Sequence, residues 1–174
     1  MAHDTVDRQR PAAGAAMASV NALVAWFLEG LDRRDVWRVL AAGLAAEIVW
    51  EIWARMVTPV IIGGPLEPAG LVLSLFHLDY SLYWLGEAIH LVTGFVFYPL
   101  GYVLLFRRVL PGDVYVRGAI YGVLLWVFAL GICAPLAGLP IFLGFIPLSF
   151  MSLIGHTLFG LFAAVTYERL KAAG

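Results

Sequence analysis

Three ionisable residues lie one helical turn apart in a segment that is otherwise apolar. Glu47, Glu51 and Arg55 occur at i, i+4 and i+8 within residues 46–59, which puts their side chains on one helical face. A charge inside a membrane helix costs at least about 2.5–3.5 kcal/mol on insertion scales. This polar stripe (Glu47, Glu51 and Arg55) therefore needs partners, and Glu51 and Arg55 are spaced to pair with each other.

Other chemistry-bearing side chains lie in segments that could face the stripe. Glu87 and His90 have the i, i+3 spacing of carboxylate-bridged di-iron bundles, although those bundles carry the motif twice and this chain carries it once. His90 and His156 could be axial ligands of a b-type haem. Alternatively, Glu51, Glu87, His90 and His156 could bind a metal ion. Three further polar residues are secondary candidates for the same site: Cys133, His77 and Asp79.

Three functions remain open for these residues. In a structural role, the glutamates and histidines form hydrogen bonds between helices and the Glu51–Arg55 pair neutralises itself. In a cofactor role, they hold haem or a metal ion. In transport or proton relay, ionisable groups inside the membrane form the path, and segments broken by Pro and Gly mark the binding region.

The composition indicates an integral membrane protein. The chain of 174 residues is 62% hydrophobic and 13% charged, whereas a soluble domain averages about 45–50% apolar and about 25% charged residues. The formal net charge of −1 and the lack of a basic stripe mixed with aromatic residues argue against nucleic-acid binding. The single cysteine excludes an intrachain disulfide.

Apolar runs and their breakers predict an all-α membrane four-helix bundle. Residues 1–16 are expected to be a disordered tail, and the apolar periodicity of residues 17–32 predicts an amphipathic helix in the membrane interface or on a partner. Residues 36–168 then form the membrane domain, with a short helix or interfacial loop at 71–80 and a re-entrant connection after the third span. The four predicted spans are residues 36–62, 83–106, 116–136 and 149–167.

The distribution of basic residues orients these spans. Lys and Arg occur before the first span, around the turn between the second and third, and after the fourth, but not in the other two connections. The positive-inside rule then places both termini in the cytoplasm. With this orientation, Glu51, Glu87, His90, His156 and Cys133 fall in one layer of the outer leaflet.

A weak internal repeat relates the two halves of the chain. Trp50 and Pro59 match Trp126 and Pro135, each pair being nine residues apart. In the other two spans, the matching residues are His90, Gly94 and Tyr102 in one half and His156, Gly160 and Tyr167 in the other. These matches predict two helical hairpins of like orientation, related by a pseudo-twofold axis along the membrane normal.

With these histidine–glycine–tyrosine motifs and the Pro/Gly-rich segment after the first span, the chain resembles a group of uncharacterised bacterial four-span membrane proteins. The resemblance covers about residues 38–168 and implies a four-helix membrane domain without an established activity. The glutamates of the first span are not part of it.

We therefore expect a multi-pass protein of a bacterial inner membrane that is not an enzyme. Its expected role is structural, accessory or small-ligand binding, with a haem or metal subunit of a redox complex and a small transporter as alternatives. Its partners would be the lipid bilayer and either further copies of the chain or a membrane complex.

Reporter fusions test the predicted topology. Fusions after residue 112 and at the C-terminus should report the cytoplasm. Fusions near Glu67 and Phe145 should report the outside, because these residues lie in the two connections that contain no Lys or Arg. A cytoplasmic signal at Glu67 would contradict the four-span arrangement.

Overall fold

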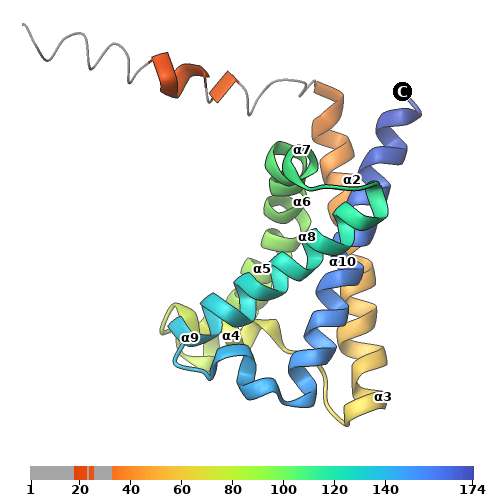
Figure 1. Cartoon of the computed structure of the whole chain (residues 1–174). Coiled ribbons are helices and arrows are strands. Elements are labelled where there is room, and N and C mark those ends of the chain that lie inside the picture. The colour runs from red at the N-terminus through yellow and green to blue at the C-terminus, as the bar shows by residue number, and fades with distance from the viewer. Residues whose placement is uncertain (1–17, 23, 26–32) are drawn as a thin grey trace, which may run out of the picture. The chain divides into compact units, whose positions relative to one another are not determined.

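The computed structural model describes residues 18–22, 24–25 and 33–174, which Figure 1 shows as ribbons. The chain divides into two units, Met1–Asp32 and Arg33–Gly174. The predicted tail (1–16) lies outside the described residues. Of the predicted interfacial helix (17–32), residues 18–22 and 24–25 are helical and the remainder also lies outside them. Residues 33–174 contain every element that positions the candidate site.

The described part of the chain contains helices and no strand, so the all-α prediction is confirmed. Two helical segments form the first half of the larger unit, with a short helix between them: α2 (Arg33–Ile52), η1 (Trp53–Val57) and α3 (Thr58–Ile62); α4 (Pro68–Leu75); η2 (Tyr80–Leu82), α5 (Tyr83–Val92), η3 (Thr93–Phe97), α6 (Tyr98–Gly101), η4 (Tyr102–Phe106) and α7 (Arg107–Val109). The second half consists of α8 (Val114–Trp126), η5 (Val127–Cys133) and α9 (Ala134–Leu136), then η6 (Ile141–Phe145), and α10 (Pro147–Ala172).

Three helical segments in the described part are long and apolar enough to cross a membrane. They are Tyr80–Val109, Val114–Leu136 and Pro147–Ala172. The segment from α2 to α3 is equally long, but it carries the charged stripe and so is less apolar than the other three. Length and composition therefore support a membrane protein, and the role of the α2–α3 segment depends on how its charges are paired.

The α2 helix lies between two of the apolar segments. It packs against α10 on one side and against η3 and α6 on the other, while α10 also packs against α8. Figure 1 shows α2 and α8 running from the upper end to the lower end, and α10 returning upward to the C-terminus. The polar stripe on α2 and η1 is therefore held among the segments that are apolar enough to span.

Prolines explain three of the wide helical turns. The π-helical segments η1, η3 and η5 each end two residues before a proline, namely Pro59, Pro99 and Pro135. Proline lacks an N–H group and its ring collides with the carbonyl four residues earlier. Bonding to the fifth residue back relieves that collision, as in the bond from Tyr98 N–H to Thr93 O. Each π segment rotates the side chains that follow it about the helix axis, relative to the side chains that precede it.

Glycines allow the closest helix contacts. In α8, a Cβ on Gly122 would lie 2.6 Å from Thr157 Cα of α10, and a Cβ on Gly118 would lie 2.9 Å from Gly160 O. Between α2 and η3, a Cβ on Gly43 would collide with the backbone of Phe95. These small residues let backbones approach in the manner typical of membrane helices.

A buried polar network joins α2 to α10 near the C-terminus. Asp35 is only 1% exposed and accepts hydrogen bonds from Tyr167 Oη at 2.8 Å and Arg38 Nη1 at 3.2 Å. Next to it, Arg107 Nε donates to Glu168 at 2.6 Å. The first turn of α2 therefore carries a carboxylate that is buried against the C-terminal part of α10.

Because α8 and α10 approach each other closely, adding one methyl group at Gly122 should destabilise the protein. Gly122→Ala should lower the melting temperature of the purified protein, because overpacking costs about 1–3 kcal/mol and exceeds the gain in helix propensity. Gly101→Ala is the matched control, because the atom nearest to its Cβ would be Tyr121 Oη at 3.6 Å, an ordinary contact. Equal melting temperatures for the two variants would show that α8 and α10 are not packed this closely.

Candidate functional site

Two helical segments supply the ionisable residues of the candidate site. Glu47 and Glu51 lie on α2, and Arg55 follows in η1. Glu87 and His90 lie on α5, one turn apart. Since η3, the continuation of α5, packs against α2, the two sets face each other.

Glu47, Glu51 and His90 converge on a common point. His90 Nε2 lies 3.4 Å from Glu47 Oε1 and 3.8 Å from Glu51 Oε1. One ligand atom from each of the three residues lies within 4.8 Å of the others. A metal ion with bonds of about 2.0–2.2 Å places neighbouring ligand atoms about 3.0–3.5 Å apart. A small adjustment of side chains would therefore bring this cluster (Glu47, Glu51 and His90) to metal-binding distances.

The polar atoms of the cluster are buried and poorly satisfied. The Glu47 side chain is 9% exposed. Both Glu47 carboxylate oxygens, Glu51 Oε1 and His90 Nε2 have no hydrogen-bond partner among the described residues. Burying polar atoms without partners is costly. A cation that accepts these lone pairs would remove that cost.

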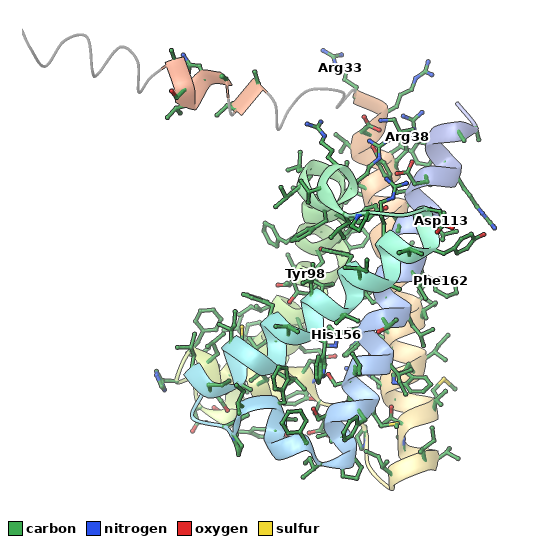
Figure 2. All side chains as sticks on the ribbon, viewed as in Figure 1. Arg33, Arg38, Tyr98, Asp113, His156 and Phe162 are labelled. Atoms are coloured by element: carbon green, nitrogen blue, oxygen red, sulfur yellow. The ribbon has the colours of Figure 1, made fainter. Side chains whose placement is uncertain are left out.

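A small cavity adjoins the cluster. Its volume is about 10 Å³, which is about the space that one water molecule requires and is enough for a single ion. Figure 2 labels two of the lining residues, Tyr98 and His156. The complete lining consists of Glu47, Trp50, His90, Gly94, Tyr98, His156 and Phe159.

Gly94 creates the room for the buried carboxylate. A Cβ at this position would collide with Glu47 Oε2. On its other side, Glu47 borders an open groove of about 290 Å³ whose remaining lining is apolar: Leu44, Leu91, Val92 and Phe95. Glu47 is thus the polar group between the cavity and an apolar face of the protein.

Arg55 pairs with two carboxylates at one side of the cluster. Its Nε donates to Glu51 Oε2 and its Nη2 donates to Glu87 Oε1. The Glu51–Arg55 pair expected from the i, i+4 spacing is therefore present. The structure adds Glu87 as a second partner from another helix.

The family comparison places this site in an uncharacterised group. Residues 33–174 match DUF6789, which is described as a family of unknown function. The chain belongs to this family. No curated protein and no solved structure matches the chain. The expected resemblance to an uncharacterised family is thereby confirmed, and the family supplies no activity for the cluster.

The two histidines are not arranged to hold a haem between them. The Trp50 ring lies against both of them, with centroid distances of 4.5 Å to His156 and 6.0 Å to His90. His156 Nδ1 also lies 2.8 Å from the Ser152 carbonyl oxygen. The cavity of about 10 Å³ has no space for a macrocycle. The donor set fits a single ion and does not fit haem.

Two of the four metal ligands expected from the sequence are absent from the observed cluster, and one residue that was not expected joins it. Glu51 and His90 do converge, but Glu87 is bound to Arg55. His156 is outside the converging set, and its Nδ1 lies 2.8 Å from Ser152 O of its own helix. Glu47 takes part instead. The sequence indicated that Glu47 could join Glu51, because the two residues share one helical face. It did not indicate that both face His90, since this depends on how α2 and α5 pack.

The secondary candidates lie in other surroundings. Cys133 is a half-buried free thiol at the end of η5. His77 is an exposed residue with φ of 54° in the loop after α4. Asp79 caps η2 by accepting the Ser81 N–H at 2.8 Å, and its hydrogen bonds with Ser81 lower the pKa of its carboxyl group. The structure does not place these three residues in the converging set.

The shared ion pair predicts an order of stabilities. Arg55→Ala leaves Glu51 and Glu87 without their cation, which should cost about 1–2 kcal/mol, since solvent screens a side chain that is 41% exposed. Adding Glu51→Gln should recover part of the loss, and adding Glu87→Gln as well should recover more. Thermal melts of the three variants measure this order. A triple variant no more stable than Arg55→Ala would show that the three residues are not coupled.

Proposed function

We propose that this DUF6789 protein is a four-span membrane protein that binds one divalent transition-metal ion through Glu47, Glu51 and His90. The observation that carries the proposal is the convergence of three buried ligand atoms that have no hydrogen-bond partners among the described residues. This function deepens the small-ligand-binding role expected from the sequence.

The pairing of charges supports α2–α3 as a fourth span. Glu51 and Arg55 pair with each other, and Arg55 also reaches Glu87 in the apolar segment Tyr80–Val109. Glu47 lies against His90 of the same segment. Ionisable residues inside a membrane bundle are expected to face the interior and pair in this way. With these partners, α2–α3 can cross the bilayer alongside the three apolar segments.

The local charge balance favours a divalent cation. Three carboxylates (Glu47, Glu51 and Glu87) surround one guanidinium and one imidazole. Metal binding requires the carboxylates to be ionised and the imidazole to be neutral, and in that state the formal charge of the five groups is −2. One divalent ion would neutralise this charge and coordinate the unpaired oxygens.

The types of ligand select a class of metal. Carboxylate oxygen and imidazole nitrogen suit Mn²⁺, Fe²⁺, Co²⁺ and Zn²⁺. Copper(I) prefers thiolate or thioether ligands, and calcium takes six to eight oxygen ligands. The chain's only cysteine, Cys133, is not in the cluster.

The proposed topology places the site away from the basic end of the protein. Arg33 and Arg38, which Figure 2 labels, lie at the end of the unit where Figure 1 marks the C-terminus. Arg34 donates to Gly174 O at 2.6 Å. By the positive-inside rule, this end faces the cytoplasm of a bacterial inner membrane. The metal site then lies in the outer half of the bilayer.

Metal analysis tests the proposal. Protein purified in mild detergent without chelator should retain about one metal ion per chain. After chelation, Zn²⁺, Mn²⁺ or Co²⁺ at a hundredfold excess over the dissociation constant should stabilise it by about 2.7 kcal/mol. Glu47→Gln and His90→Ala should abolish this stabilisation, although Glu47→Gln should barely change the melting temperature of the metal-free protein.

Glu67→Gln is the matched control, because Glu67 is an exposed carboxylate outside the cluster. It should bind metal as the wild type does. A wild-type protein that carries no metal and is not stabilised by any of the three ions would refute metal binding and leave a structural role.

A further inference from the structure

Glu51 belongs both to the metal cluster and to the ion pairs of Arg55. Its Oε2 accepts from Arg55, while its Oε1 faces His90 Nε2 at 3.8 Å. The guanidinium therefore lies directly beside the proposed metal site. Arg55 and a metal ion would be two cations that depend on one carboxylate.

Glu87 has the position of a ligand, but its carboxylate binds Arg55. It precedes His90 by three residues on α5, so the two side chains lie on one helical face. Glu87 Oε1 accepts from Arg55 Nη2, and the buried Glu87 Oε2 has no hydrogen-bond partner among the residues described. A metal ion held by His90 would thus lie within one helical turn of a carboxylate with a free oxygen.

We propose that Arg55 is an internal competitor of the metal ion, and that its outward movement releases Glu87 to become the fourth protein ligand. This inference rests on the metal binding proposed above and describes how Arg55 would regulate that binding. In the metal-free protein Arg55 pairs with Glu51 and Glu87, and in doing so it keeps the metal site incomplete.

The burial of the side chains fits this exchange. Arg55 is the most exposed of the four charged groups, at 41%, whereas the Glu47 side chain is 9% exposed. A long arginine side chain can leave its apolar stem in place and move its charged head toward water. Glu47 and His90 lie deeper, so they would hold the metal while Arg55 moves.

Electrostatic repulsion and the coordination number of the metal also favour the outward movement of Arg55. A metal ion beside Glu51 would repel the guanidinium and weaken its attraction to the shared carboxylate. Zn²⁺ sites with three protein ligands keep one position for another group, and closed sites use four protein ligands. Glu87 would supply this fourth ligand from the helix that already supplies His90.

Cobalt titration of four proteins tests the proposal: wild type, Glu87→Gln, Arg55→Met, and Arg55→Met with Glu87→Gln. Arg55→Met retains an apolar stem but no charge, so it should bind Co²⁺ at least about tenfold more tightly than wild type. Adding Glu87→Gln should reverse the gain by about 10–100-fold, as expected for losing a group that tunes a metal site. The visible absorption of bound Co²⁺ should also differ between Arg55→Met and the double variant, because the double variant has one protein ligand fewer.

Glu67→Gln in the Arg55→Met background is the control, and it should leave both affinity and spectrum unchanged. If Arg55→Met does not fold, wild type and Glu87→Gln decide the matter. A ligand role requires weaker binding in Glu87→Gln, whereas a residue that only anchors Arg55 would give unchanged or tighter binding.

The outcomes separate this inference from the proposed function. If no variant binds Co²⁺, Zn²⁺ or Mn²⁺, metal binding itself fails. If wild type binds one ion but Arg55→Met binds no more tightly, or Glu87→Gln has no effect in that background, then the site stands and the competition by Arg55 is refuted.

Discussion

The need to compensate the charged stripe of α2 constrains the rest of the structure. Glu47, Glu51 and Arg55 lie on a helix that packs between segments apolar enough to span a membrane. Uncompensated, such charges would oppose insertion. Their partners come from α5, through Glu87 and His90. The pairing of α2 with α5 is therefore an electrostatic requirement as well as a packing contact.

Close backbone approach makes this compensation possible. Gly43 and Gly94 remove the side chains that would separate α2 from η3, and Gly94 leaves the volume that the Glu47 carboxylate occupies. Gly118, Gly122 and Gly160 do the same for α8 and α10. Since lipid tails are as apolar as leucine, tight packing of this kind is a main source of association between membrane helices.

The π segments set which side chains face the interior. In η1, the wide turn before Pro59 carries Arg55, and it follows directly on the α-helical turn that carries Glu51. In η3, the wide turn before Pro99 carries Gly94 beside Glu47. Such π-bulges occur frequently at functional sites because they rotate a helix locally without ending it. The prolines thus contribute to the site although none of them lines the cavity.

The sequence by itself determined the helices and the Glu51–Arg55 pair. Hydrophobic runs and their Pro and Gly breakers depend on neighbouring residues, and an i, i+4 pair is defined by the geometry of one helix. Only the tertiary structure decided that His90 faces the polar stripe while His156 stays outside the cluster, with its ring against Trp50. It also decided that Glu47 joins the cluster, that Glu87 turns to Arg55, and that Asp35 is buried. The physical reason is that the rotation of each helix about its axis is set by glycine contacts, π turns and partner helices, and none of these is expressed in the periodicity of a single segment.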